Sequence, residues 1–135
     1  MSHSRKPIVL APGEGRHYAL GPMRAVFLAD NEETSTKYSI SEWWLEPYQP
    51  GPGAHRHEHN DDIFYVLDGP VTFQVDDGYF DVERGGCVIA TAGTLHDFMN
   101  RTGHRVGLLN FYVPGGFEDD MPAIVEWYAR QAKED

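Results

Sequence analysis

Short apolar segments separated by turn-forming residues are the feature of this sequence that most limits its fold. Most segments have four to eight residues rich in β-branched and aromatic side chains, as β-strands do. These segments are residues 24–28, 37–45, 63–67, 71–75, 79–82, 87–91, 96–100 and 106–113. Turn signals such as Asp68-Gly69-Pro70 and Asp76-Asp77-Gly78 stand between them. The pattern predicts an all-β sandwich or barrel.

The chain after residue 113 has a different pattern. A Pro-Gly-Gly run at 114–116 ends the last strand, and the following aspartates and Pro122 suit the start of a helix. Ile124, Val125 and Tyr128 would share one face of that helix. We expect this face to cover one end of the barrel.

The length of the chain and its uninterrupted pattern predict a single domain. The 135 residues suit one compact unit, and we find no internal repeat or linker. We place the domain at residues 1–135, with the barrel core at about 24–113 and the C-terminal helix at about 119–131.

Charge and cysteine content limit the partners and the compartment. With 11 Lys and Arg against 21 Asp and Glu, the net charge is −10, which disfavours binding to nucleic acid or to an anionic membrane. No run approaches the roughly 20 apolar residues that span a bilayer. The single cysteine, Cys87, excludes an internal disulfide and favours a reducing, cytoplasmic setting, and its apolar neighbours predict that it is buried.

Residues 55–62 read HRHEHNDD and form a candidate metal site. In an extended segment, side chains two residues apart point the same way. Three such imidazoles cannot easily bind one ion, because the outer two lie ~13 Å apart along a strand. The metal-binding pair is therefore His55 with His57, or His57 with His59.

Asp62 begins the next strand and faces the same side as its core residues. If Asp62 joins His55 and His57, the loop between them has four residues, and if it joins His57 and His59, the loop has two. Both lengths form hairpins, so both registers stay open, and the four-residue loop, a common length, favours the first.

A second histidine lies at the start of a later strand. Thr91-Ala92-Gly93 forms a turn before it, and His96, Phe98 and Asn100 share one face of that strand. A lone histidine there is usually an ordinary hydrogen-bonding residue. His96 becomes a candidate metal ligand only if the fold places it beside the histidines of residues 55–59 and Asp62.

Together, these segments resemble the two motifs of the cupin superfamily. The first motif has His-x-His, three or four residues, a glutamate, six residues and a glycine, and His55, His57, Asp62 and Gly69 fit its spacing. The second has a glycine, five residues, Pro-x-Gly, two residues, a histidine, three residues and an asparagine. The residues that fit it are Gly85, Thr91, Gly93, His96 and Asn100.

Three positions depart from the family pattern. Thr91 replaces the proline of the second motif, and Gln49 replaces the first glycine of the first motif; both should affect turns only. Asp62 replaces the glutamate and is shorter by about 1.5 Å of reach. It could bind the metal directly or through water, or leave the metal to three histidines.

The resemblance is to small single-domain cupins related to quercetin dioxygenases. It implies a double-stranded β-helix, or jelly-roll, barrel with His55, His57, Asp62 and His96 around one divalent transition metal. Iron, manganese and nickel suit an open six-coordinate site, and zinc also fits. The resemblance further implies that Asp62 acts as a base on the substrate, and that the protein forms a homodimer by pairing N-terminal strands.

Strand parity and the resemblance together suggest a substrate pocket. Phe64 and Phe98 should face inward with the ligands, with Asn100 beside them. One of the adjacent Trp43 and Trp44 should point inward, and we assign Trp44 to the pocket.

These features favour a metal-dependent oxidoreductase of dioxygenase type that acts on a small organic substrate, such as an aromatic or enediol molecule. Two alternatives stay open: a metal-dependent isomerase or lyase, and a cupin that binds a small ligand without turnover. The fold alone does not separate them.

Overall fold

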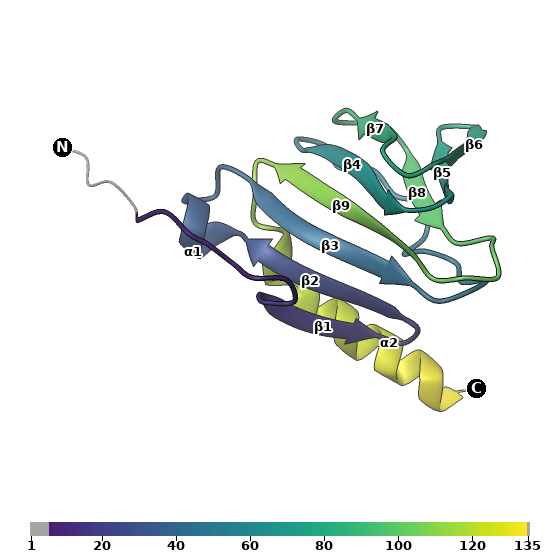
Figure 1. Cartoon of the computed structure of the whole chain (residues 1–135), viewed down its shortest axis with the longest axis horizontal. Coiled ribbons are helices and arrows are strands. Elements are labelled where there is room, and N and C mark those ends of the chain that lie inside the picture. The colour runs from purple at the N-terminus through teal and green to yellow at the C-terminus, as the bar shows by residue number, and fades with distance from the viewer. Residues whose placement is uncertain (1–5, 135) are drawn as a thin grey trace.

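The computed structural model describes residues 6–134, and within this range the strands form a six-stranded and a three-stranded antiparallel sheet (Figure 1). The larger sheet has the order β1-β2-β3-β9-β4-β7 and the smaller one β6-β5-β8. The strands are β1 (Arg16–Leu20), β2 (Met23–Ala29), β3 (Ser39–Leu45), β4 (Asp61–Asp68), β5 (Val71–Val75), β6 (Gly78–Val82), β7 (Cys87–Ala90), β8 (His96–Met99) and β9 (Val106–Val113).

The two sheets share one core. Alternate residues of each strand face it, so that β3 buries Ser39, Ser41, Trp43 and Leu45. Aromatic rings join the sheets: the Phe64 ring of β4 lies 5.7 Å from the Phe98 ring of β8. The predicted all-β fold with a C-terminal helix is confirmed.

The C-terminal segment covers one end of this core. A short 3-10 helix, η1 (Phe117–Asp120), leads into α2 (Met121–Glu134), which lies against β1 (Figure 1). Met121 is buried, and Ile124, Val125 and Tyr128 pack against the core, as their spacing predicts. None of the helices in residues 6–134 is long and apolar enough to cross a membrane.

Two N-terminal elements differ from expectation. The sheet begins with β1 at Arg16, earlier than about residue 24, and a short helix, α1 (Asn31–Thr34), follows β2. Local hydrogen bonds explain the start of α1: the Asp30 carbonyl accepts the Glu33 N–H at 3.0 Å, and the Glu33 side chain accepts the Asp30 N–H at 2.9 Å.

Candidate metal centre

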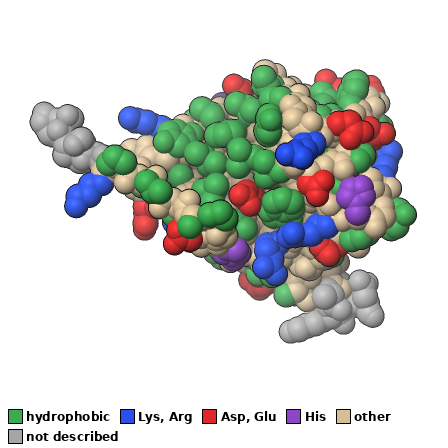
Figure 2. Space-filling model, in the orientation of Figure 1, with side chains coloured by type: hydrophobic (Ala, Val, Ile, Leu, Met, Phe, Trp, Pro, Cys, Tyr) green, Lys and Arg blue, Asp and Glu red, His purple; other side chains and the backbone are tan. Residues whose placement is uncertain are grey.

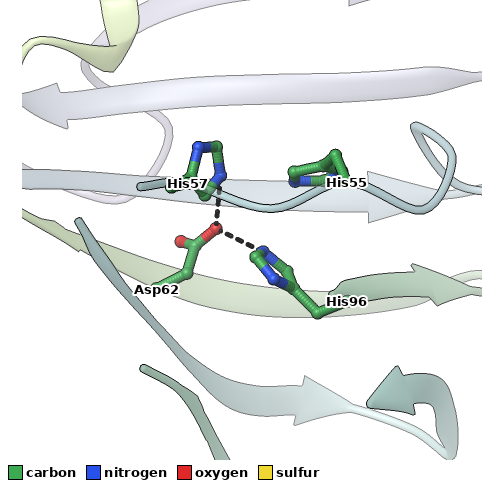
Figure 3. Close-up of side chains that lie close together, drawn as sticks. All are labelled: His55, His57, Asp62 and His96. Carbon is green, nitrogen blue, oxygen red and sulfur yellow. Dashed lines mark hydrogen bonds and ion pairs between the residues drawn. The ribbon is translucent and has the colours of Figure 1, made fainter. Parts of the chain in front are cut away.

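The structure brings His55, His57, Asp62 and His96 together at one end of the core (Figure 3). One nitrogen or oxygen from each residue lies within 4.8 Å of the others. Ligands bound 2.0–2.2 Å from one ion lie at most ~4.4 Å apart, so small side-chain shifts would allow all four to bind. The cluster is consistent with metal binding.

The histidine segment is held beside β8 by backbone pairing. His55 and His96 form a β-bridge, with N–H to carbonyl distances of 3.0 and 2.8 Å. The His57 carbonyl accepts the Gly93 N–H at 2.8 Å. The ring of His59 lies outside, because its side chain is 87% exposed. The register that joins His55 and His57 to Asp62 is therefore the one present.

The loop before His55 requires glycine where it crosses β8. A Cβ atom on Gly51 would overlap the carbonyl oxygen of Phe98. Asp97, which by strand parity should point away from the site, is buried below this loop, and its carboxylate accepts the N–H groups of Gly53 and Phe98 at 3.2 and 2.8 Å. Burial raises the pKa of Asp97.

Backbone carbonyls fix the protonation of two rings. The Nδ1 atom of His55 lies 2.6 Å from the Gly53 carbonyl, and the Nδ1 atom of His96 lies 2.8 Å from the Thr94 carbonyl. Because a carbonyl only accepts, each Nδ1 carries the proton. The Nε2 atom of each neutral ring then has a free lone pair, which is the state that binds a metal.

Asp62 lies between two of the rings. Its Oδ2 atom is 2.9 Å from His96 Nε2 and 3.3 Å from His57 Nε2, and Asn110 donates to Oδ1 at 2.6 Å (Figure 3). Burial raises the pKa of this carboxyl, but the contact with His57 and the hydrogen bonds from His96 and Asn110 outweigh it and lower the pKa to about 2. With neutral His96, two lone pairs would face each other, so the pair needs a shared proton or a cation.

The histidine pKa values reflect the same competition. Burial lowers the pKa of His55, which keeps its ring neutral. Burial also acts to lower the pKa of His96, but the hydrogen bond to Asp62 outweighs it and the net shift is upward. The hydrogen bond with Asp62 therefore favours the protonated form of the His96 ring, whereas burial favours the neutral form that binds a metal.

His57 has a buried nitrogen without a hydrogen-bonding partner. Its Nε2 atom is enclosed and, at 3.3 Å from Asp62 Oδ2, makes a long ion-pair contact but no hydrogen bond. The Tyr112 hydroxyl lies 3.3 Å from Nδ1, at the other side of the ring. Burial raises the pKa of Tyr112 to about 12, so its hydroxyl stays protonated. An unpartnered buried nitrogen costs free energy, and a bound cation would relieve that cost.

Asn110 and Tyr112 did not emerge from the sequence. Both lie on β9, which pairs with β4 so that Asn110 stands opposite Phe64 and Tyr112 opposite Asp62. Their two-residue spacing places them on one face. The missing information was the pairing of two strands far apart in the chain.

A small cavity adjoins the cluster. It has a volume of about 50 Å³ and is lined by Met23, Trp43, Pro52, His55, Asp62, Phe64, Phe98, Asn110, Phe117, Ile124 and Tyr128. Phe64 and Phe98 are therefore placed as expected. A larger hollow of about 410 Å³ lies between the N-terminal segment and the outer side of β2 and β3, but none of the four clustered residues lines it.

Two residues assigned to the pocket lie elsewhere. Trp43 takes the inward position, while Trp44 faces outward, donates to Glu42 at 3.0 Å and stacks under Arg105. Asn100 is buried after the end of β8, where its amide donates to the carbonyls of Leu45, Glu46 and His104. Its amide therefore fastens two loops, and the expectation that Trp44 and Asn100 line the cavity is wrong.

The Asn110→Ala variant tests the support of Asp62. Losing the donor to Oδ1 should lower the affinity for a divalent metal by about 10–100-fold, the usual effect of losing a residue that orients a ligand. Calorimetric titration of metal into the metal-free protein measures it. Gln74→Ala is the control, because that amide donates to the Asp76 carbonyl on an exposed turn, and it should change affinity less than about 3-fold. Equal affinities in all three proteins would contradict the prediction.

Comparisons with known proteins agree with this site and fold. A family model described as "Cupin domain" matches residues 42–112, more than half of the chain. Quercetin 2,3-dioxygenase of Bacillus subtilis (strain 168) is 26% identical over an alignment of 117 residues that covers 83% of this chain and 33% of that protein. The chain thus spans about a third of the length of this relative.

Solved structures show the same fold. KdgF from Halomonas sp. superposes with a TM-score of 0.73 at 14% identity, covering 84% of this chain and 99% of that one. A predicted oxalate decarboxylase from Thermotoga maritima gives a TM-score of 0.72 at 19% identity, covering 79% and 99%. At these identities the similarity concerns the fold alone.

Proposed function

Because the chain belongs to the cupin domain family, we propose that it is a metal-dependent oxidoreductase of dioxygenase type that acts on a small organic molecule. The observation that carries the proposal is the convergence of His55, His57, Asp62 and His96, with a buried, unpartnered His57 nitrogen. The distant similarity to a quercetin dioxygenase supports the reaction type.

Three neutral imidazoles and one carboxylate suit a divalent transition ion. Iron, manganese and nickel are the candidates, and zinc also fits this donor set. When bound, such an ion would act as a Lewis acid and orient the substrate. The protein's own contribution is to fix the rings of His55 and His96 through the Gly53 and Thr94 carbonyls.

We also propose a catalytic role for Asp62. Its Oδ2 atom faces the histidines and the carboxylate borders the cavity, while Asn110 holds Oδ1. In that position Oδ2 would accept a proton from a substrate hydroxyl. Its low pKa keeps the group ionised and ready to accept, although it makes the carboxylate a weak base.

Metal analysis combined with oxygen uptake tests the proposal. Protein purified without added ions should contain close to one equivalent of iron, manganese or nickel. It should consume oxygen with at least one member of a panel of enediols, diketones and flavonols, and Asp62→Asn should remove that consumption. A metal-loaded protein that consumes no oxygen across the panel would contradict the oxidoreductase assignment. Retention of a ligand without product would favour a binding role.

We propose that two copies form a homodimer. The outer face of the larger sheet carries apolar side chains (Figure 2), including the cross-strand row Ile40, Phe111, Ile63 and Ile89. Ile89 is 60% exposed, and Val9 in the N-terminal segment is 90% exposed. Monomeric proteins rarely expose contiguous apolar surface of this kind. Sedimentation equilibrium should give twice the monomer mass, and a monomer at all concentrations would exclude the dimer.

We propose the cytoplasm as the compartment, on the basis of Cys87. The chain has no second cysteine, and the thiol is exposed, which corrects the expectation that it is buried. An exposed thiol persists best in a reducing setting.

A further inference from the structure

The C-terminal segment forms part of the wall of the cavity beside the metal cluster. His55 and Asp62 line one part of it, while Phe117 of η1 and Ile124 and Tyr128 of α2 line another. The segment that follows β9 therefore forms part of the wall that a ligand of the metal would meet.

The cavity is too small for an aromatic ring. One water needs a cavity of about 10–15 Å³, so a cavity of about 50 Å³ holds roughly four non-hydrogen atoms. An engineered apolar cavity that binds benzene has about 150 Å³. A flavonol cannot enter a space of this volume unless the wall changes.

The cavity wall also limits the charge of the ligand. Among the described residues that line it, none is Lys or Arg, and most are aromatic or aliphatic. A phosphate ester or dicarboxylate would leave at least one negative charge without a partner, which is costly in an apolar setting. A neutral molecule or a monoanion avoids that cost.

Phe117 is the residue of the C-terminal wall whose ring contacts a ligand histidine and its neighbour Tyr112. Its ring lies 6.4 Å from the His57 ring and 5.1 Å from the Tyr112 ring. It stacks on Phe27 at 6.2 Å and meets the edge of Trp43 at 6.1 Å. Aromatic neighbours on several sides leave the ring little freedom to turn away.

The backbone around Phe117 is tied to the N-terminal strands. The buried carboxylate of Asp30 accepts the N–H groups of Gly116 and Glu118, both at 2.6 Å. Arg16 binds the Glu118 carboxylate through Nε at 2.6 Å and Nη2 at 2.8 Å, and the Tyr18 hydroxyl donates to it at 2.7 Å. Both neighbours of Phe117 are thus fixed, so that the ring stays in the wall.

We propose that Phe117 sets the size limit of the site, so that the native substrate is a compact, neutral or singly charged molecule with two oxygen donors, such as a short enediol, hydroxy acid or diketone. This inference rests on the proposed function in one respect: it assumes that the substrate binds the metal through its oxygen donors. It narrows the substrate class by excluding molecules that place an aromatic ring in the cavity.

Two hydroxamates with the same chelating group test the limit. Acetohydroxamate has a methyl body and benzohydroxamate a phenyl body. In the Ni(II)-loaded wild type, we expect acetohydroxamate to bind at least ~10-fold more tightly, because forcing a ring into a packed wall is costly. In Phe117→Ala, this preference should fall by at least ~10-fold, and in Phe117→Leu by less. Calorimetry gives each affinity.

A metal-free measurement separates this inference from the proposed function. Removing the Phe117 ring should enlarge the cavity toward the volume that holds benzene. Benzene should therefore raise the Tm of metal-free Phe117→Ala by at least ~2 °C and leave that of the wild type unchanged. If Ni(II) does not bind at all, the proposed function fails, while the benzene result still decides the inference.

Phe80→Ala is the matched control, because its ring is 55% exposed on β6. It should behave as the wild type with both hydroxamates and with benzene. The inference is overturned if wild type binds the two hydroxamates equally, if Phe117→Ala keeps the wild-type preference, or if benzene stabilises Phe117→Ala no more than the wild type. If Phe117→Ala does not fold, Phe117→Leu must show the same direction of change.

Discussion

The His57→Ala variant is expected to lose at least ~100-fold in affinity for a divalent metal, more than the roughly 10–100-fold cost of losing an outer partner of a ligand. His57 is one of four clustered ligand residues, and its Nε2 atom is the buried nitrogen without a hydrogen-bonding partner. The metal-free protein should keep its stability, because the substitution also removes that unfavourable burial. Metal analysis after dialysis, and metal-induced changes in Tm, measure both effects.

His59→Ala is the matched control for this variant. The two histidines are two residues apart in the sequence, but the His57 side chain is 17% exposed and the His59 side chain is 87% exposed. His59→Ala should bind metal as the wild type does. Full metal content in His57→Ala, or loss of metal in His59→Ala, would show that the histidine register is different from the one described.

The spacing of the motif predicted the ligands because it depends on local geometry. His55 and His57 point the same way in an extended segment, and Asp62 follows after a loop short enough to return it to them. His96 could be joined to them only through the family resemblance, since no local rule pairs it with His55. In the structure, that link is the β-bridge between His55 and His96.

The inward and outward positions of the two tryptophans show where parity alone fails. Parity requires that Trp43 and Trp44 face opposite sides, but it does not say which one faces the core. The pairing of β3 with β9 decides: Trp44 stands opposite Gly107, which leaves room for its large ring on the outer face. A glycine in an otherwise apolar strand was the available signal.

The role of the C-terminal segment was only partly predictable. Helical spacing placed Ile124 and Tyr128 on the face that covers the barrel, and both line the cavity. Phe117 comes before that helix, where no periodic pattern applies. Its position depends on the contacts of Asp30 and Arg16, which are 87 and 101 residues away in the sequence (117 − 30 and 117 − 16).

Among the proposed substitutions, Phe27→Ala should cause the largest loss in the free energy of unfolding. The loss should be about 3–5 kcal/mol, as is usual for removing a buried phenyl ring. The Phe27 side chain is fully buried, and its ring contacts those of Tyr18, Trp43 and Phe117. The substitution thus removes the platform on which Phe117 stacks, as well as core volume. Urea unfolding measures the loss, with Phe80→Ala as an exposed control expected to change stability by less than about 1 kcal/mol. Since small domains have only about 5–15 kcal/mol in total, Phe27→Ala should unfold at markedly lower urea concentration. A loss no larger than that of the control would mean that the ring does not join the core to the C-terminal segment.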